Sequence, residues 1–509
     1  MKQQVVDDFE TKLQACGCYN TAGDDRRLQA FSDLQEILNL WSNQMLLQQQ
    51  QRQLTSLSSS SSSSSSTTEQ RQSPGISLVP FGSYRLNVHT QDSDLDVLAL
   101  SPPHCSRSEF FTSLVELLQG DTGISELHPI PTAYTPVVKF LLHGITIDLL
   151  FVRLNSPTKL LEHQSLPSSP SRNYYSIDDS DLVGLDEAQL RSINGARVSQ
   201  RLLEIVPSDA HFRLVLRAVK GWARACGIQS NVLGFLGGIN WAILVTWICI
   251  HHQPSSTEQQ QQLLDPSTLL YLFFRTFATW KWPEPVMLEP PQSVPPPGVL
   301  QMPSWNPEAN PRDGLHLMPI LTPAYPTMNS SYSVGIPQLR RIQDELYRAA
   351  YVMEKSNGNV SLLFQRSGGD DFFHRHSNFV QVIISASNGN DLIVWSRFCE
   401  TKLRLLISGL ETEEVEAWPY SNFFADKTSK LHELYFFVGL RFAPDIEQVN
   451  LQDSTLDFLL KANDWEGRIS GMDVKLNRIL ASELPSFVLG ENGKVSLGQT
   501  EIVDCEMLL

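Results

Sequence analysis

Residues 80–97 read PFGSYRLNVHTQDSDLDV, and the features of this stretch decide the fold. A short apolar strand precedes Gly82-Ser83, where glycine lets the backbone approach an anion closely and a following helix points free N–H groups at it. Further along, Asp94 and Asp96 are two residues apart on a predicted strand, so both carboxylates project from one face. We therefore expect a phosphate-binding turn beside a pair of carboxylates that can share Mg²⁺ with substrate phosphates.

The row of acids leaves two strand registers open, because Asp92 continues the alternation of Asp94 and Asp96. Ser93 is polar, whereas Leu95 supplies the apolar half of a strand that enters a core. This contrast favours Asp94 and Asp96 as the functional pair.

A third acid, Asp148, lies within the apolar run ITIDLLF at residues 145–151, which we predict to be a strand. A carboxylate in such a place is costly unless it meets a cation. Three carboxylates on neighbouring strands suit two metal ions, one that lowers the pKa of an attacking hydroxyl and one that holds a triphosphate. Gly-Ser and Asp-x-Asp are each common in turns, but their combination with a strand-embedded acid predicts a nucleotidyltransferase.

The composition is that of a globular protein of about three domains. The chain has 509 residues, of which 41% are hydrophobic and 18% are charged. Its 39 basic and 55 acidic residues give a net charge of −16, the wrong sign for holding nucleic acid by bulk electrostatics. A nucleic-acid partner would need a local basic groove or metal ions. The 7 cysteines form no repeated pair with metal-ligand spacing, and their odd number suits a reducing compartment.

One segment approaches the length of a membrane span, because residues 225–250 carry no charged side chain. Glycines and a polar residue interrupt it at Gly234, Gly237, Gly238 and Asn240, so we predict a helix buried between domains. The N-terminus MKQQVVDD lacks the apolar stretch of a secretory leader. We expect no membrane partner.

The spacing of apolar residues changes along the chain and predicts regions of different structure. In the first two thirds we predict amphipathic helices at 5–47, a flexible insertion after them, strands at 96–100 and 145–151, and a helical region at 185–278 that includes 212–222. In the final third we predict strands at 379–384 and 434–442 and helices near 395–406 and 474–480, which together make a small sheet with helices on one face.

Five sequence blocks carry a family resemblance: FGSYRLNVHT at 81–90, ID at 147–148, SINGARV at 192–198, SNVLGFLGG at 230–238 and HLMPILTPAYP at 316–326. The chain resembles the nucleotidyltransferase superfamily of the DNA polymerase β type. Within that superfamily it resembles the messenger-RNA-type nuclear poly(A) polymerases of eukaryotes. The resemblance covers nearly the whole chain, and several of the blocks are specific to the subfamily.

The resemblance implies an α+β multidomain fold with a nucleotidyltransferase palm on a mixed sheet, a helical central domain, and a C-terminal α/β sandwich similar to an RNA-recognition (RRM) fold. We accordingly expect five segments: N-terminal helices that pack with the central domain at 1–47, a disordered Gln/Ser-rich insertion at 48–74, the catalytic domain at 75–184, the helical central domain at 185–335 and the RRM-like RNA-binding domain at 336–509.

The implied activity is template-independent addition of AMP from ATP to the 3′-hydroxyl of (pre-)mRNA, with release of pyrophosphate and two Mg²⁺ (or Mn²⁺) ions as cofactors. Carried over by position, Asp94, Asp96 and Asp148 look like the catalytic metal ligands. The positions that look like ATP contacts are Phe81, Gly82, Ser83, Thr90, Asn194, Lys220, Gln229, Gly238 and Ile239. Closure of the helical domain over the palm would bring Lys220 and Asn194 to the nucleotide.

The chain departs from the family pattern at two places beside the expected site. Gln229 stands where the family usually has a tyrosine, and Gln91 and Asp92 stand where it has a lysine and a glycine. Losing one positive charge and gaining one negative charge there should weaken triphosphate binding or strengthen metal dependence.

The resemblance also implies partners and a location: the RNA 3′ end, cleavage and polyadenylation factors, and the nucleus, although no basic import signal is visible. Two other functions stay open. One is a catalytically weak RNA-binding or scaffold member of the 3′-end processing machinery, and the other is a non-messenger-type terminal nucleotidyltransferase.

Overall fold

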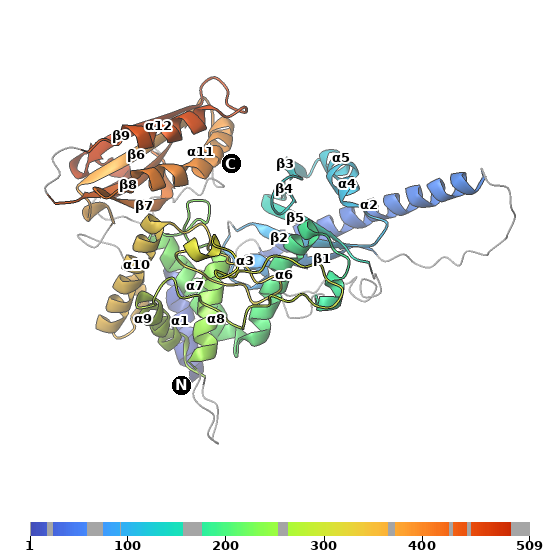
Figure 1. The fold of residues 1–509 in the computed structure, drawn as a ribbon, viewed down its shortest axis with the longest axis horizontal. Coiled ribbons are helices and arrows are strands. Elements are labelled where there is room, and N and C mark those ends of the chain that lie inside the picture. Colours follow the sequence, from blue (N-terminus) through green and yellow to red (C-terminus); the bar gives the residue numbers. More distant parts are fainter. Residues whose placement is uncertain are drawn as a thin grey trace, which may run out of the picture.

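The computed structural model describes residues 2–17, 24–58, 75–91, 93–155, 176–252, 263–364, 372–426, 431–444 and 449–489. These residues form a palm built on one sheet, a central unit of helices, and a C-terminal unit built on a second sheet (Figure 1). The expected α+β multidomain fold is confirmed.

The palm contains a mixed sheet with the strand order β1-β2-β5-β4-β3. Its strands are β1 (Ser77–Pro80), β2 (Leu95–Ser101), β3 (Ile124–Ile130), β4 (Val137–Leu142) and β5 (Ile145–Arg153). The two strands predicted from sequence are β2 and β5, which run parallel to each other, whereas the other neighbouring pairs are antiparallel.

Helices cover both faces of the palm sheet. They are α2 (Asp24–Ser58), α4 (Arg107–Phe111) and α5 (Ser113–Gln119) on one face and α6 (Glu187–Ile205) on the other. Val97 of β2 packs in the apolar cluster under α2, α4 and α5, and the next residue, Leu98, packs in the cluster under α6. This alternation follows from the two-residue period of a strand and explains why β2 is apolar on both sides.

The central unit is made of helices around one apolar core. Its helices are α1 (Lys2–Ala15), α7 (Asp209–Ala225), α8 (Gly238–His251), α9 (Pro266–Ala278) and α10 (Ile336–Lys355). The apolar run expected to form a buried helix is α8, in which Trp241 through Val245 are buried. No helix in the described ranges is long and apolar enough to cross a bilayer.

The C-terminal unit contains an antiparallel sheet with the order β7-β8-β6-β9. Its elements are β6 (Asn378–Ala386), α11 (Gly389–Leu410), β7 (Val415–Phe424), β8 (His432–Phe442), α12 (Gln452–Asn463), β9 (Asp473–Leu480) and the short α13 (Ser486–Leu489). The succession βαββαβ, with α11 and α12 on one side of the sheet (Figure 1), is that of an RRM-like fold.

Our prediction of a helix near 474–480 is wrong, because this segment is strand β9. Val474 and Leu476 alternate with polar residues, and the whole segment pairs with β6, from Asp473 opposite Ser385 to Leu480 opposite Asn378. So short a run does not distinguish helix from strand by spacing alone, and the open edge of β6 decides the outcome. Strand β7 was not predicted at all.

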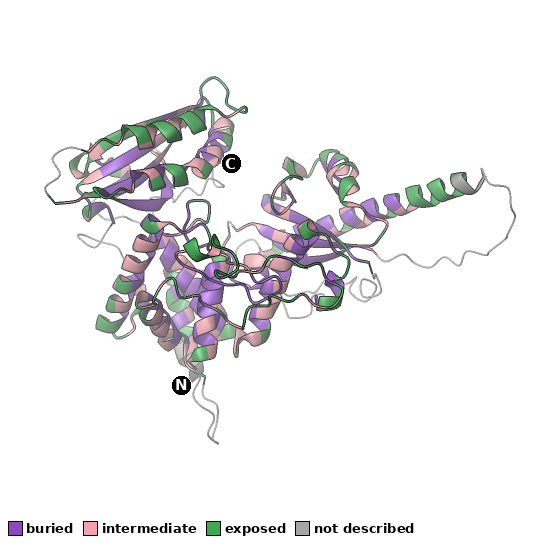
Figure 2. Ribbon diagram, in the orientation of Figure 1, coloured by how far each residue is buried: buried purple, intermediate pink, exposed green. Residues whose placement is uncertain are grey.

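The N-terminal helices also differ from expectation. Only α1 packs on the central core, through Phe9 and Leu13, whereas α2 packs on the palm through residues that include Leu34 and Trp41. The insertion expected to be disordered from residue 48 is helical up to Ser58, and residues 47–55 of this helix are exposed (Figure 2). The rest of that insertion lies outside the described residues.

Two helices pack with a different unit from the one to which the expected domain limits assign them. α6, expected in the central domain, shares an apolar cluster with palm residues such as Leu98 and Leu150. α10, expected at the start of the RNA-binding domain, has Ile342 and Leu346 in the central core.

A buried arginine joins the central and C-terminal units. Arg341 of α10 is 0% exposed and donates through Nη1 to Glu345 at 2.7 Å, while Nε donates to the Pro419 carbonyl of β7 at 3.2 Å. Its Nη2 donates to the Cys226 carbonyl at 2.8 Å, just beyond α7. Arg375 also donates to Glu345, at 2.6 Å. This network fixes the C-terminal sheet against the loop that follows α7.

Replacing Arg341 should loosen the C-terminal unit from the rest. Removing one partner of a buried ion pair costs about 3–5 kcal/mol, so Arg341→Ala should lower the temperature of at least one calorimetric unfolding transition. Arg478→Ala is the matched control. Arg478 is exposed, and within the described part of the chain its side chain bonds to the side chain of Asn378. Equal transition temperatures for Arg341→Ala and the unmutated protein would contradict the role given to this network.

Candidate active site

Three carboxylates meet where β2 and β5 run side by side. In the register of this parallel pair Asp96 lies opposite Asp148, and Asp94 precedes the first residue of β2. One carboxylate oxygen from each of the three lies within 4.8 Å of the others. Among the described residues this is the one group of at least three acids, histidines or cysteines close enough to hold a metal ion.

The electrostatics of the cluster favour a cation. Burial raises the pKa of Asp94 and, more strongly, that of Asp96, and the charge of Asp148 adds to both shifts. Lys139 of β4 donates to Asp148 Oδ2 at 2.5 Å and partly offsets this repulsion. Asp148 Oδ1 is buried and has no hydrogen-bond partner within the described part of the chain. An unpartnered buried oxygen beside two carboxylates with raised pKa values fits a divalent metal site.

Gly82 is required by the approach of the backbone to this cluster. Its φ is +60°, and a Cβ at this position would lie 2.1 Å from Asp96 Oδ2. The Gly82 amide donates to Ser199 Oγ of α6 at 3.2 Å. The helix expected after the turn is α3 (Gly82–Arg85), which is only a single turn long.

Residues at the start of α2 hold the loop between α3 and β2 in place. This contact was not predicted from the sequence. Arg27 Nη2 lies 3.0, 2.6 and 2.8 Å from the carbonyl oxygens of Thr90, Gln91 and Ser93. One turn earlier, Asp24 accepts from or pairs with His89 Nε2 at 2.8 Å. Both ends of the loop that leads into Asp94 are thereby held from the same helix.

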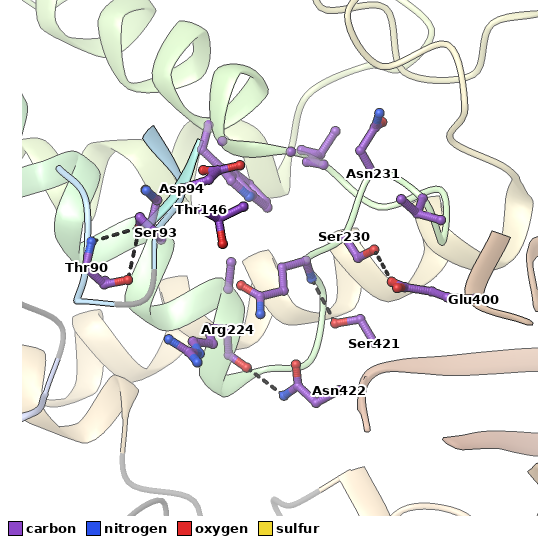
Figure 3. Close-up of a pocket in the computed structure, with 18 of the residues that line it drawn as sticks. Thr90, Ser93, Asp94, Thr146, Arg224, Ser230, Asn231, Glu400, Ser421 and Asn422 are labelled. Carbon is purple, nitrogen blue, oxygen red and sulfur yellow. Dashed lines mark hydrogen bonds between the residues drawn. The ribbon is translucent and has the colours of Figure 1, made fainter. Parts of the chain in front are cut away.

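Asp94 of this cluster lines a cavity of about 700 Å³, to which all three units contribute residues (Figure 3). The palm contributes Thr90 and Asp94, the central unit contributes Lys220 and Gln229, and the C-terminal unit contributes Glu400. Such a volume is sufficient for a nucleotide.

Four of the nine expected nucleotide contacts line this cavity, and the other five do not. Thr90, Lys220, Gln229 and Gly238 line it directly. Thr90 Oγ1 lies 3.1 Å from Ser93 Oγ, a hydrogen bond drawn in Figure 3. Ile239 follows Gly238 in the first turn of α8 and packs partly buried against the central core.

The remaining expected contacts lie on the palm beside α6. Phe81 caps the start of α3, and its ring would be 3.0 Å from a Cβ at Gly195. Asn194 precedes that glycine, and its Oδ1 is buried with no hydrogen-bond partner in the described ranges. Ser83 is partly buried on α3. Asp92, the charge expected to disturb triphosphate binding, lies outside the described residues.

Lys220 of α7 reaches from the central unit towards the palm. Its Nζ donates to the Val88 carbonyl at 3.0 Å. Desolvation lowers the pKa of Lys220 from its ordinary value to about 8, although Asp94 and Asp96 pull in the opposite direction. The ammonium therefore lies at the interface between the central unit and the palm, close to Asp94 and Asp96.

Several cavity residues were missed from sequence because they come from distant segments. Lys139 could have been found as the strand partner of Asp148, but the register of β4 on β5 had first to be known. Arg397, Ser421 and Asn422 belong to the C-terminal unit, and no local pattern marks them as lining this cavity.

The chain is similar along most of its length to known protein families. The poly(A) polymerase nucleotidyltransferase domain matches residues 2–206, the poly(A) polymerase central domain matches 211–365, and the poly(A) polymerase predicted RNA binding domain matches 371–427.

Individual relatives agree with these matches. Nuclear poly(A) polymerase 1 of Arabidopsis thaliana is 37% identical over 419 residues, which are 80% of this chain and 55% of that protein. Poly(A) polymerase of Dictyostelium discoideum is 33% identical over 501 residues, which are 95% of this chain and 57% of that protein. The chain therefore spans little more than half the length of these relatives. The solved structure of a cytoplasmic RNA terminal U-transferase aligns with a TM-score of 0.40 and 15% identity, over 72% of this chain and 99% of that one.

Gly82→Ala should disrupt the carboxylate cluster without unfolding the palm. The added Cβ would collide with Asp96 Oδ2 and force that carboxylate to move. We expect Mn²⁺ affinity, measured by electron paramagnetic resonance, to fall about 10- to 100-fold, as it does when the support of a metal ligand is lost. Gly120→Ala is the control, because a Cβ there meets its nearest atom at 3.5 Å, an ordinary contact. Unchanged Mn²⁺ affinity in Gly82→Ala would argue against a metal at this cluster.

Proposed function

The chain belongs to the poly(A) polymerase family, and we propose that it transfers AMP from ATP to the 3′-hydroxyl of RNA without a template. The 3′-oxygen attacks the α-phosphorus, the bond between the α- and β-phosphates breaks, and pyrophosphate leaves. The observation that carries this proposal is the carboxylate triad, whose ligand oxygens lie within 4.8 Å of one another and whose Asp94 lines a cavity shared by all three units.

Asp94, Asp96 and Asp148 would hold two divalent ions, Mg²⁺ or Mn²⁺. When bound, these ions supply Lewis-acid activation of the attacking hydroxyl and neutralise charge on the triphosphate. The raised pKa values of Asp94 and Asp96 and the unpartnered Oδ1 of Asp148 support this assignment.

The central unit supplies groups for the triphosphate. Lys220 offers a point positive charge that can approach the phosphates from the side opposite the palm. Gly238 and Ile239 are in the first turn of α8, where backbone N–H groups have no partner inside the helix and suit an anion. Gln229 of the central unit also lines the cavity. On the palm, Asn194 of α6, whose Oδ1 is buried and unpartnered among the described residues, suits the ribose or the RNA 3′ end.

The palm turn supplies the approach to the phosphates. Gly82 brings the backbone next to Asp96, and Phe81 and Ser83 flank it. Thr90 lies on the loop that leads into Asp94 and lines the cavity. These four residues would position the triphosphate against the carboxylates.

RNA would reach the cavity along the C-terminal unit, which contributes Arg397 to the lining and matches a predicted RNA-binding domain. We propose the nucleus as the place of action, because the relatives from Arabidopsis thaliana are named nuclear poly(A) polymerases. We propose cleavage and polyadenylation factors as partners that would bring the protein to its RNA.

The nucleotide preference of the purified protein tests the proposal. With Mg²⁺ and an RNA primer, we expect extension with ATP in preference to the other three nucleoside triphosphates. Asp148→Ala should reduce extension at least about 100-fold, because a ligand of the reacting metal is lost. Glu116→Ala, which removes an exposed acid from α5 of the same unit, should extend normally. Preference for UTP would identify a different terminal transferase, and absence of any extension would indicate a scaffold.

The pH dependence should report Lys220. Its ammonium is charged below a pKa of about 8 and neutral above it, so kcat/KM for ATP should fall as the pH rises through about 8. Lys220→Arg should shift this fall to higher pH, because a guanidinium stays protonated. Lys281→Arg, at an exposed lysine away from the cavity, is the control and should keep the original profile. Identical profiles for Lys220→Arg and the unmutated protein would exclude this role.

A further inference from the structure

The loop between α7 and α8 has an unusual backbone at Ser230. Its φ is +85°, a left-handed conformation that residues with a Cβ rarely adopt. Ser230 stands between Gln229 and Asn231, and all three line the cavity beside the carboxylates. A non-glycine residue keeps such a conformation only where its surroundings hold it, and such positions concentrate at functional sites.

The group that holds Ser230 comes from the C-terminal unit. Ser230 Oγ donates to Glu400 Oε1 of α11 at 3.0 Å, across 170 positions of the sequence. The same hydroxyl accepts from the Leu233 amide at 3.4 Å. Figure 3 shows Glu400 and Ser230 facing each other across the cavity wall, with Asn231 next to Ser230. The carboxylate therefore determines where the hydroxyl points, and the hydroxyl in turn bonds the next turn of the loop.

Strand β7 fastens the loop on the other side of Ser230. The Ser421 amide donates to the Gly227 carbonyl at 3.0 Å, and Ser421 Oγ accepts from the Gln229 amide at 3.1 Å. Asn422 Nδ2 donates to the Arg224 carbonyl at 3.0 Å. β7 thus fixes the loop through hydrogen bonds to its backbone, and α11 fixes it through the side chain of Ser230.

We propose that Glu400 is a positioning residue for the nucleotide. By holding Ser230 in its left-handed conformation, it keeps Gln229 and Asn231 at the wall of the ATP cavity, so the C-terminal unit contributes to nucleotide affinity as well as to RNA binding. This inference rests on the proposed function, because the cavity is taken to bind ATP. Glu400 acts through Ser230 and is not assigned any contact with the substrate.

An interface role alone would have different consequences. Glu411 also joins the two units, since Arg340 Nη1 of α10 donates to its Oε2 at 3.0 Å, but Glu411 does not line the cavity. If Glu400 only stabilised the interface, losing either carboxylate would lower thermal stability and leave ATP affinity alone. If Glu400 positions the loop, only its loss changes ATP affinity.

The experiment measures Mg·ATP binding to the full chain by calorimetry, together with KM and kcat in primer extension. Glu400→Ala should weaken ATP binding and raise the KM for ATP about tenfold, the effect of losing one hydrogen bond to a charged group. The kcat at saturating ATP and the KM for the RNA primer should change less than about twofold. Glu411→Ala should bind ATP as the unmutated protein does.

Three further variants separate positioning from damage to the fold. Glu400→Gln keeps an acceptor oxygen and should restore most of the ATP affinity. Ser230→Ala removes the other half of the same bond and should reproduce the loss. In the double variant Ser230→Gly/Glu400→Ala, glycine adopts a positive φ without strain, so ATP should bind several-fold more tightly than to Glu400→Ala.

The possible outcomes distinguish a failure of the positioning role of Glu400 from a failure of the proposed function. Unchanged ATP binding in Glu400→Ala, or an equal loss in Glu411→Ala, would overturn the positioning role. If the unmutated protein binds Mg·ATP but extends no primer, the proposed function fails, and the binding comparison still decides the role of Glu400. If it binds no Mg·ATP, both proposals fall.

Discussion

Mutual repulsion of three partly buried carboxylates is the constraint on which the rest of the site depends. The parallel pairing of β2 with β5 places Asp96 opposite Asp148, and Asp94 precedes the same strand. Burial and neighbouring negative charge both raise the pKa values of Asp94 and Asp96, so folding this sheet works against ionisation of its own acids. The arrangement is stable only because cationic groups and rigid backbone surround it.

The palm and the central unit both supply part of that surrounding structure. The palm provides Lys139 against Asp148, and the central unit provides Lys220, whose charge lowers the pKa values of Asp94 and Asp96. Helix α2 provides Arg27, which holds the loop before Asp94 by its carbonyl oxygens. The site therefore depends on more than the palm, because a palm without the central unit would lose the countercharge of Lys220.

The three carboxylates could be predicted from sequence because their signals are local. The other residues that line the cavity could not, because they depend on contacts between distant segments. Two-residue spacing placed Asp94 and Asp96 on one face, and an acid within an apolar run identified Asp148 as the third. The segment at 474–480 was assigned to a helix because its pairing with β6 is not visible in its own spacing. Glu400 and Arg27 were missed for the same reason, since their partners lie 170 and more than 60 positions away.

The net charge of −16 acquires a different meaning once the cavity is known. Among the described residues, its lining contains five basic side chains against three acidic ones, namely Lys139, Arg217, Lys220, Arg224 and Arg397 against Asp94, Glu126 and Glu400. This acidic chain thus has a locally basic cavity. The acids that line its described part are Asp94 of the carboxylate cluster, Glu126 on β3 and Glu400, which bonds Ser230. Bulk charge repels a polyanion, so affinity for the proposed substrates must arise within this short range, where charges that are partly withdrawn from water interact more strongly.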